Sequence, residues 1–503
     1  MSFPSLSNIQ LKNVLHLSPP LKKIFSINDK GIKHVIISAE EKPQNMIYLG
    51  KIKETTPGTD FLNANLWMDI SRPKIILIFG RRGSGKSYDL GIICEGLNSN
   101  PDKIKTGSYR PPVIIFDPLN QFWTLGEIPN EENEVEKRQI DSLNAWGLTA
   151  QNLEKVEIFI PKGTPKRHPD AKEFVINVTN MSIDDWCGFF KVDKYSDTIG
   201  QLMSAAYRKV TEEGYISNRK RIKPIKDYDI INLINCIQTD EEINDGERGF
   251  SRQTTRAVLS RLYELSNMPL FQKTSDINIK NIFSPGQTSV FMLREVDENT
   301  RSVIISLIVK KILQSRGIRW ENEEIAKKLL DKAKKESISS DKKKKYSEMA
   351  EKRLKEAEEK GIDAGWIIID EAHIICPSQG TSAAKEILIE YAKQGRCMGL
   401  SLAAATQQPS ALSSRLISQR DVIFTHQLGI KSDIDTALSQ MSPNFPDTIY
   451  EGRNEINQNI PYIILNSLEK GEAIVSTDES NRNFIIKVRP RVSSHGGNEP
   501  IFI

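Results

Sequence analysis

The chain has 503 residues, of which 38% are hydrophobic and 27% charged. This composition predicts a packed globular protein of about two to four structural units and excludes global disorder. Its 69 basic and 65 acidic residues leave a net charge of +4. That balance neither indicates nor excludes a nucleic-acid partner, because positive charge gathered in one groove would not change it.

The five cysteines, Cys94, Cys187, Cys236, Cys376 and Cys397, are odd in number, and none has CxxC spacing. This usage argues against a disulfide framework or a zinc site and favours a reducing cytoplasm. No run approaches 18 uninterrupted apolar residues, and the N-terminus lacks a basic stretch followed by an apolar core. We therefore expect no signal peptide, no membrane span and no membrane partner.

The order of apolar runs predicts an α/β fold. In residues 1–70, HVIIS (34–38) and MIYLGKI (46–52) are typical of strands, which indicates a small, reduced barrel-like β domain. From residue 71 on, apolar runs alternate with helical stretches, as in a mostly parallel sheet buried on both faces. These predicted strands are 74–80, 111–118, 156–163, 288–294, 366–373, 400–409 and 421–428.

Two segments interrupt this alternation and divide the predicted core. Residues 181–285 read as a helical insertion between a first part of the core, 71–180, and a second part, 286–484. Within the second part, residues 320–360 are dense in charge. That segment predicts a solvated helical hairpin, and a partner-binding arm is the alternative. Residues 485–503 remain as a C-terminal tail.

The stretch GRRGSGKS (80–87) fits the pattern G-x-x-x-x-G-K-[ST] between a buried strand and a helix. Its glycines let successive backbone N–H groups point at phosphate oxygens, and the helix presents its positive end to the same anion. Lys86 is expected to reach the β- and γ-phosphates, and the Ser87 hydroxyl to ligate Mg²⁺. The stretch therefore predicts an ATP site, and its predicted binding residues are Gly80, Arg82, Gly83, Ser84, Gly85, Lys86, Ser87 and Tyr88.

Acidic and amide side chains follow two later strands. In WIIIDEAH (366–373), Asp370 is placed to hold Mg²⁺ and Glu371 to polarise the attacking water. His373 is more often structural at such a position. In LSLAAATQQP (400–409), Gln407 can sense the γ-phosphate or orient the water. A small-molecule kinase lacks this combination, and a two-lobed DEAH helicase needs a second lobe, for which only about 130 residues remain after Asp370.

In the order GRRGSGKS, IIIDEAH and EYAKQGRCMGLSLAAATQQPSAL, the chain resembles the HerA/FtsK group of ring-forming ATPases, and HerA most of all. The similarity covers most of residues 46–496. It implies a RecA-like P-loop core and a homohexamer that uses ATP and Mg²⁺ to move double-stranded DNA, often with a nuclease or another effector in DNA end processing or antiviral defence. The short N-terminal region and the charged segment 320–360 depart from the family pattern.

The resemblance also implies that ATP lies between two subunits, with a neighbour's arginine at the site. Arg396 in KQGRCMGL matches that position, and Arg415 and Arg420 are its competitors. Arg489 and Arg491, in a tail that reaches the adjacent subunit in this family, are expected at the nucleotide pocket or ring contact. Arg81 and Arg82 are expected to point toward the neighbouring subunit or the nucleotide.

DNA contacts are the least determined part of the sequence. Basic residues gather in ISNRKRIKPIK (216–226) and in TPKRHPD (164–170), and each segment is either a DNA-binding loop or a solvated surface loop. Two other functions remain open. One is a coupling ATPase for conjugation or secretion, and the other is a scaffold whose nucleotide state controls assembly of an effector.

Overall fold

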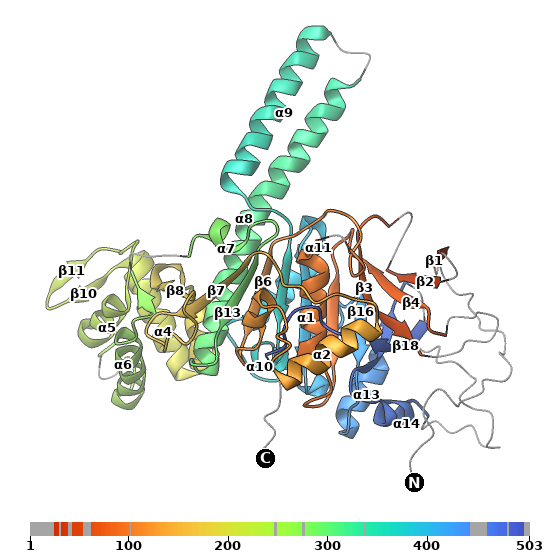
Figure 1. Cartoon of the computed structure of the whole chain (residues 1–503). Helices are drawn as coiled ribbons and strands as arrows, with labels where there is room; N and C mark the ends of the chain where they lie inside the picture. Colours follow the sequence, from red (N-terminus) through yellow and green to blue (C-terminus); the bar gives the residue numbers. More distant parts are fainter. Residues whose placement is uncertain are drawn as a thin grey trace.

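The computed structural model describes residues 25–29, 32–38, 43–53, 62–100, 102–245, 249–273, 277–335, 339–442, 460–479 and 482–496. One sheet of 14 strands runs through these residues, with helices on both of its faces (Figure 1). Alternate residues of one central strand pack into two different cores: Ile75 and Leu77 into one, Ile76 and Ile78 into the other. The predicted α/β class is confirmed.

The strands of the first half of the chain are β1 Phe25–Asp29, β2 Ile32–Ile37, β3 Met46–Ile52, β4 Asn65–Asp69, β5 Ile75–Phe79, β6 Val113–Asp117, β7 Val156–Pro161, β8 Lys172–Phe174, β9 Ile176–Asn177, β10 Tyr215–Ser217 and β11 Lys220–Ile222. Those of the second half are β12 Phe271–Gln272, β13 Thr288–Met292, β14 Trp366–Ile369, β15 Ser401–Thr406, β16 Val422–Thr425, β17 Glu472–Thr477 and β18 Arg482–Val488. Every strand predicted from residue 74 onward is present.

The α-helices are α1 Lys86–Asn98, α2 Glu134–Ala145, α3 Ile183–Phe190, α4 Thr198–Arg208, α5 Ile230–Thr239, α6 Arg252–Ser266, α7 Ile279–Ile282, α8 Glu298–Ala333, α9 Ser340–Lys360, α10 Ala372–Ile375, α11 Lys385–Met398, α12 Ser414–Ile417, α13 Lys431–Gln440 and α14 Ile460–Ser467.

The order in the large sheet is β1-β2-β4-β3-β18-β17-β16-β5-β15-β14-β6-β13-β7-β8. From β16 to β8 all neighbouring strands are parallel. The registers align their carboxyl ends, since Phe79 pairs with Thr406 and Phe116 pairs with Ile369. Side chains that follow β5, β15, β14 and β6 therefore meet at one edge, where ligands of such sheets bind. We call it the carboxyl edge.

The N-terminal strands do not form the separate small β domain expected for residues 1–70. They extend the core sheet, because β3 pairs with β18 in antiparallel fashion. Helix α1 also packs directly on β3, so closely that a Cβ on Gly96 would lie 2.7 Å from the side chain of Ile47. Residues 1–24 lie outside the described part of the chain.

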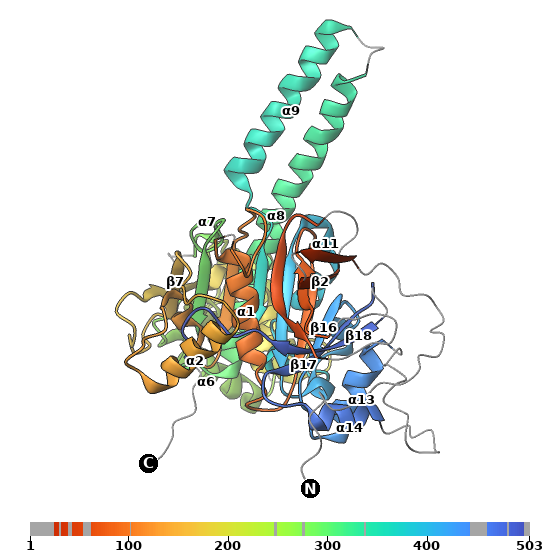
Figure 2. The ribbon, with the colours of Figure 1, turned by 45° about the vertical axis from the view of Figure 1, so that its right-hand side comes forward.

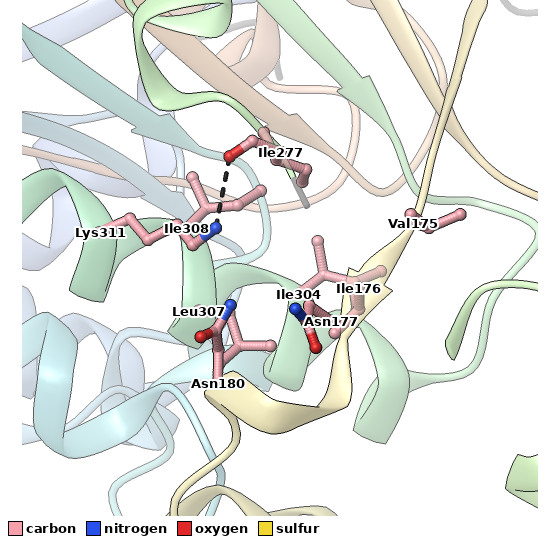
Figure 3. Close-up of a pocket in the computed structure, with 9 residues that line it drawn as sticks. All are labelled: Val175, Ile176, Asn177, Asn180, Ile277, Ile304, Leu307, Ile308 and Lys311. Atoms are coloured by element: carbon pink, nitrogen blue, oxygen red, sulfur yellow. Dashed lines mark hydrogen bonds between the residues drawn. The ribbon is translucent and has the colours of Figure 1, made fainter. Parts of the chain in front are cut away.

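The insertion 181–285 is mostly helical, as predicted, and carries α3 to α7 together with the small hairpin β10–β11. Within it, a buried hydrogen bond of 2.9 Å joins the Trp186 indole to the Tyr228 hydroxyl. The insertion packs on α8 beside a mainly apolar cleft of only about 20 Å³, where Lys311 donates to the Ile277 carbonyl (Figure 3). That space admits little more than one water molecule.

The charged segment 320–360 forms a helical hairpin, as predicted, from the outer part of α8 and from α9. Figure 1 and Figure 2 show it standing well clear of the body. Because α8 starts after β13 and α9 leads into β14, the hairpin leaves the molecule at the amino ends of the strands, opposite the carboxyl edge.

In the described residues we find no helix long and apolar enough to cross a membrane.

Candidate nucleotide site

The phosphate loop joins β5 to α1 at the carboxyl edge. Gly83 and Gly85 have φ angles of 75° and 122°, which favour glycine. Lys86 is the first residue of α1, and its ammonium group donates to the Arg81 carbonyl at 3.0 Å, across the loop. Burial lowers the pKa of Lys86, although Glu371, Asp370 and Asp89 oppose that shift. The loop thus holds a cation beside N–H groups at a helix start, a geometry that fits a phosphate.

A buried histidine packs against the phosphate loop. His426 follows β16, the neighbour of β5, and is fully buried. Its Nδ1 donates to the Glu472 carbonyl at 2.8 Å, and its Nε2 lies 2.8 Å from an Asp89 carboxylate oxygen. A Cβ on Gly80 would lie 2.8 Å from His426 and 2.4 Å from Ser84 Oγ. Gly80 is therefore required by close packing.

Asp370 lies at the end of β14, where it faces the loop. The Ser87 hydroxyl donates to Asp370 Oδ2 at 2.6 Å, and the Glu371 N–H donates to Oδ1 at 2.9 Å. Burial, reinforced by the Glu371 carboxylate, raises the pKa of Asp370 to about 6. A buried carboxylate at this position gains from a divalent cation, which would offset its desolvation.

A second acid, Asp117, ends the adjacent strand β6. Its carboxylate accepts from the backbone N–H groups of Leu119, Gln121 and Phe122 at 2.6–3.1 Å. Burial, with a smaller contribution from Asp370, raises the pKa of Asp117 to about 7. The site therefore contains two neighbouring acids that both resist ionisation.

Glu371 is held in a strained backbone conformation, with φ at 53°. The Gln407 amide donates to Glu371 Oε1, and His373 Nδ1 lies 3.5 Å from Oε2. Oε2 is buried and has no hydrogen-bond partner in the described structure. Burial and Lys86 lower the pKa of His373, whose Nδ1 also lies 3.0 Å from the Thr406 hydroxyl. Residues at the ends of β14 and β15 thus hold the Glu371 carboxylate in place, and its Oε2 keeps no hydrogen-bond partner in the described structure.

These residues fit a nucleotide with Mg²⁺. A hydroxyl and one carboxylate are the protein ligands that Mg²⁺ takes beside phosphates and water. In the described residues there is no group of three or more His, Cys, Asp or Glu side chains able to hold a metal by itself. Ser87 and Asp370 would hold the ion. With Lys86, Glu371 and Gln407, they gather at one edge as the sequence predicted.

The arginines divide into two groups. Arg81 and Arg82 belong to the phosphate loop, and their side chains are exposed. Arg396 lies in the last turn of α11 at the opposite edge of the sheet, where its side chain is 65% exposed and lies 3.3 Å from Asp421. The two competing arginines also have polar partners in their own chain. Arg415 pairs with Glu386 at 2.7 Å, and Arg420 donates twice to the Gln440 carbonyl. Arg396 therefore does not lie at the nucleotide edge of its own chain.

The structure places Arg489 and Arg491 elsewhere than expected. Both are buried within their own chain, where Glu95 of α1 lies 2.8 Å from Arg489 and 3.4 Å from Arg491. Tyr88 accepts from the Arg491 N–H at 2.6 Å. Residues 489–496 thus form a strap across α1 within their own chain. The physical reason is Glu95, a buried acid that needs both cations.

The basic segments differ in their surroundings. Arg167 pairs with Glu295 at 3.0 Å. The segment 216–226 overlaps the hairpin β10–β11, whose Arg219, Lys220 and Arg221 are exposed. Its two-residue turn holds Asn218 and Arg219 at φ angles of 49° and 63°. Arginine in such a turn is unfavourable, since glycine is the residue that tolerates this conformation.

Sequence reasoning missed Asp117 and the pair Asp89–His426 as parts of this site. Asp117 was detectable, because VIIFD ends in an acid after an apolar strand in the same way as IIID does. His426 was not, because its role depends on β16 lying beside β5, which the sequence does not reveal.

Comparisons with known proteins agree with this geometry. The family model "Helicase HerA, central domain" matches residues 73–312. The probable helicase MJ1565 of Methanocaldococcus jannaschii is 22% identical over 80% of this chain and 62% of its own length. The DNA double-strand break repair helicase HerA of Pyrococcus furiosus is 26% identical over 34% of this chain and 30% of its own length. The chain therefore spans less than two thirds of either relative.

Among solved structures, VirB4 of Thermoanaerobacter pseudethanolicus is similar with a TM-score of 0.47 and 14% identity, over 88% of this chain and 96% of that one. The plasmid coupling protein TrwB, in complex with ADP and Mg²⁺, gives a TM-score of 0.45 and 14% identity, over 92% and 98% of the two chains. Residues 73–312 thus match the central domain of HerA helicases, and the loop, acid and amide at one sheet edge agree with a P-loop ATPase of that type.

Proposed function

We propose that this protein is an ATP-driven translocase of double-stranded DNA that works as a homohexameric ring with a nuclease or another effector. The observation that carries the proposal is the joint placement of Lys86, Ser87, Asp370, Glu371 and Gln407 on β5–α1, β14 and β15. Two relatives named as helicases support DNA as the substrate. DNA end processing and antiviral defence are the settings in which such a motor fits.

The chemistry assigned to the chain's own residues is phosphoryl transfer to water. Lys86 and the loop N–H groups bind the β- and γ-phosphates, and Ser87 and Asp370 would hold a Mg²⁺ ion that would neutralise charge on them. Glu371 orients the attacking water and takes its proton through the oxygen that has no partner. Gln407 and His373 fix the direction of that carboxylate from the neighbouring strand.

Arg396 is the residue we assign to the neighbour's site. It is exposed at the edge of the sheet opposite its own phosphate loop, so it is available to another subunit. An arginine supplied in trans contributes about 10³-fold or more to hydrolysis. Mixing Lys86→Ala with Arg396→Ala subunits tests this role. Mixed rings should recover hydrolysis that neither variant has alone, and a lack of recovery would contradict the assignment.

Hydrolysis measured with and without linear duplex DNA tests the function directly. We expect Mg²⁺-dependent hydrolysis that duplex DNA stimulates severalfold, and ring-shaped particles by electron microscopy. Glu371→Gln is the control, since it retains the binding loop and lacks the base. Rings that hydrolyse ATP without any response to DNA would overturn the translocase assignment. An effector that remains fully active with the Glu371→Gln protein would favour the scaffold.

A further inference from the structure

The hairpin of α8 and α9 separates its charges along its length. Between residues 327 and 346 lie nine lysines and three acidic residues, which give a net charge of +6. The whole chain carries only +4, so everything outside this short stretch has a net charge of −2. We call the nine lysines the basic tip. Five lie between residues 327 and 335, and four are consecutive, Lys342–Lys345.

The basic tip lacks the ion pairs that neutralise the basic residues near the base of the same hairpin. Near the base, Lys355 pairs with Glu359, Lys360 with Glu356, and Arg353 with the same Glu356. Within the described residues no lysine of the basic tip has an ion-pair partner, and all except the half-buried Lys343 are exposed. Like charges held together without counterions repel one another, so such a cluster favours a polyanion.

The hairpin holds this charge away from the body in a fixed direction. Arg316 of α8 donates to the Met398 carbonyl at 2.6 Å, and Arg319 pairs with Asp363 at 2.8 Å. Small buried residues, Ala326 and Ala350, let the two helices pack closely. From Arg316 outward α8 continues for about 25 Å at 1.5 Å per residue. Figure 1 and Figure 2 both show the hairpin separate from the other elements.

We propose that the basic tip binds the phosphate backbone of double-stranded DNA, as a contact separate from the motor's own grip. This proposal rests on the proposed function only in its choice of duplex DNA as the polyanion that binds. Lysine is a point charge that attracts phosphate without reading bases, which suits a contact that accepts any sequence. A membrane surface fits less well, because Leu330 is the one exposed large apolar side chain among the described tip residues.

Charge removal at two places on the same hairpin tests the proposal. One variant combines Lys342→Gln, Lys344→Gln and Lys345→Gln at the tip. Its matched control combines Lys352→Gln, Lys355→Gln and Lys360→Gln near the base, with an equal change of charge. Binding of the full-length proteins to a labelled duplex is measured by fluorescence anisotropy from about 50 to about 200 mM salt. Circular dichroism confirms that both variants retain the helices.

The tip variant should bind duplex DNA about tenfold more weakly at low salt, with a salt slope shallower by about 2 to 3, because each lost phosphate contact removes about 0.9 from the slope. The base variant should stay within about twofold of wild type. An equal loss of DNA affinity in both variants, or no loss in either, would overturn the proposal. So would a tip variant that loses binding to phosphatidylserine vesicles while it keeps its affinity for DNA.

The two proposals fail in different ways. If duplex DNA does not stimulate hydrolysis but the tip variant still binds DNA more weakly than the base variant, the translocase assignment fails and the basic tip remains a DNA contact. If duplex DNA stimulates hydrolysis and both variants bind DNA like wild type, the basic tip alone is overturned.

Discussion

The nucleotide site lies at the carboxyl edge of the sheet, whereas the basic tip projects beyond its opposite edge, and the two regions differ in how their charged groups are held. At the carboxyl edge, charged groups are buried and mutually fixed, as with Ser87 and Asp370 at 2.6 Å. At the tip, the lysines lack ion-pair partners in the described residues, and all of them except Lys343 are exposed. A buried site depends on the geometry of single atoms, whereas an exposed cluster depends on the number of its charges. Single substitutions should therefore have large effects in the first and small, additive effects in the second.

Loss of the proposed base should give the largest effect. Glu371→Gln keeps the shape of the side chain and removes its capacity to take a proton, so hydrolysis should fall by about 10²- to 10⁴-fold. Steady-state phosphate release measures the rate, and a fluorescent ATP analogue measures binding. Binding should persist in Glu371→Gln and vanish in Lys86→Ala. Hydrolysis within a few-fold of wild type would show that another group activates the water.

The strap across α1 should give the next largest effect, on stability. Glu95→Gln leaves Arg489 and Arg491 buried without a counterion, and breaking a buried pair costs about 3–5 kcal/mol. Chemical denaturation measures the free energy of unfolding. Glu154→Gln is the control, because its pair with Arg110 is exposed and should leave stability unchanged. Equal stability of both variants would mean that the tail does not need Glu95.

Asp117 should make the contribution of its side chain to the free energy of unfolding fall as pH rises. Its pKa is raised to about 7 in the folded chain, above the ordinary value of 3.8, so folding takes up a proton between those values. The contribution of Asp117 is therefore fully present at low pH and is lost as pH rises toward 7. The unfolding free energy of wild type minus that of Asp117→Asn, without nucleotide, should fall from about pH 4 to about pH 7. A difference that rises over this range would contradict the buried, protonated acid.

The hairpin β10–β11 should give the smallest effects. Arg219→Gly relieves an arginine held at φ 63° and should stabilise the protein by about 1 kcal/mol. If this hairpin also contacts DNA, the same change should make the salt slope of DNA binding shallower by about 1. Asn218→Gly, with the charge retained, is the control and should leave the slope unchanged. An unchanged slope in Arg219→Gly would leave the hairpin as a solvated surface loop.

Much of the fold was predictable because its strands are apolar on both faces, so runs such as KIILIFG and WIIIDEAH stand out. The phosphate loop, Asp370 and Glu371 were predictable because local patterns define them. Strand order was not predictable, since the pairing of β3 with β18 joins segments more than 400 residues apart. The same limit hid the strap, because Glu95 meets Arg489 and Arg491 only once the chain has folded.

Displacement of a third strand from triplex DNA tests the central claim most directly, because it reports movement along an intact duplex. The wild-type protein with ATP and Mg²⁺ should release the third strand from linear duplex DNA, and the Glu371→Gln protein should bind the same DNA without releasing it. Hydrolysis that DNA stimulates, with no release by the wild type, would contradict translocation. Equal release by both proteins would show that movement does not depend on the nucleotide site described above.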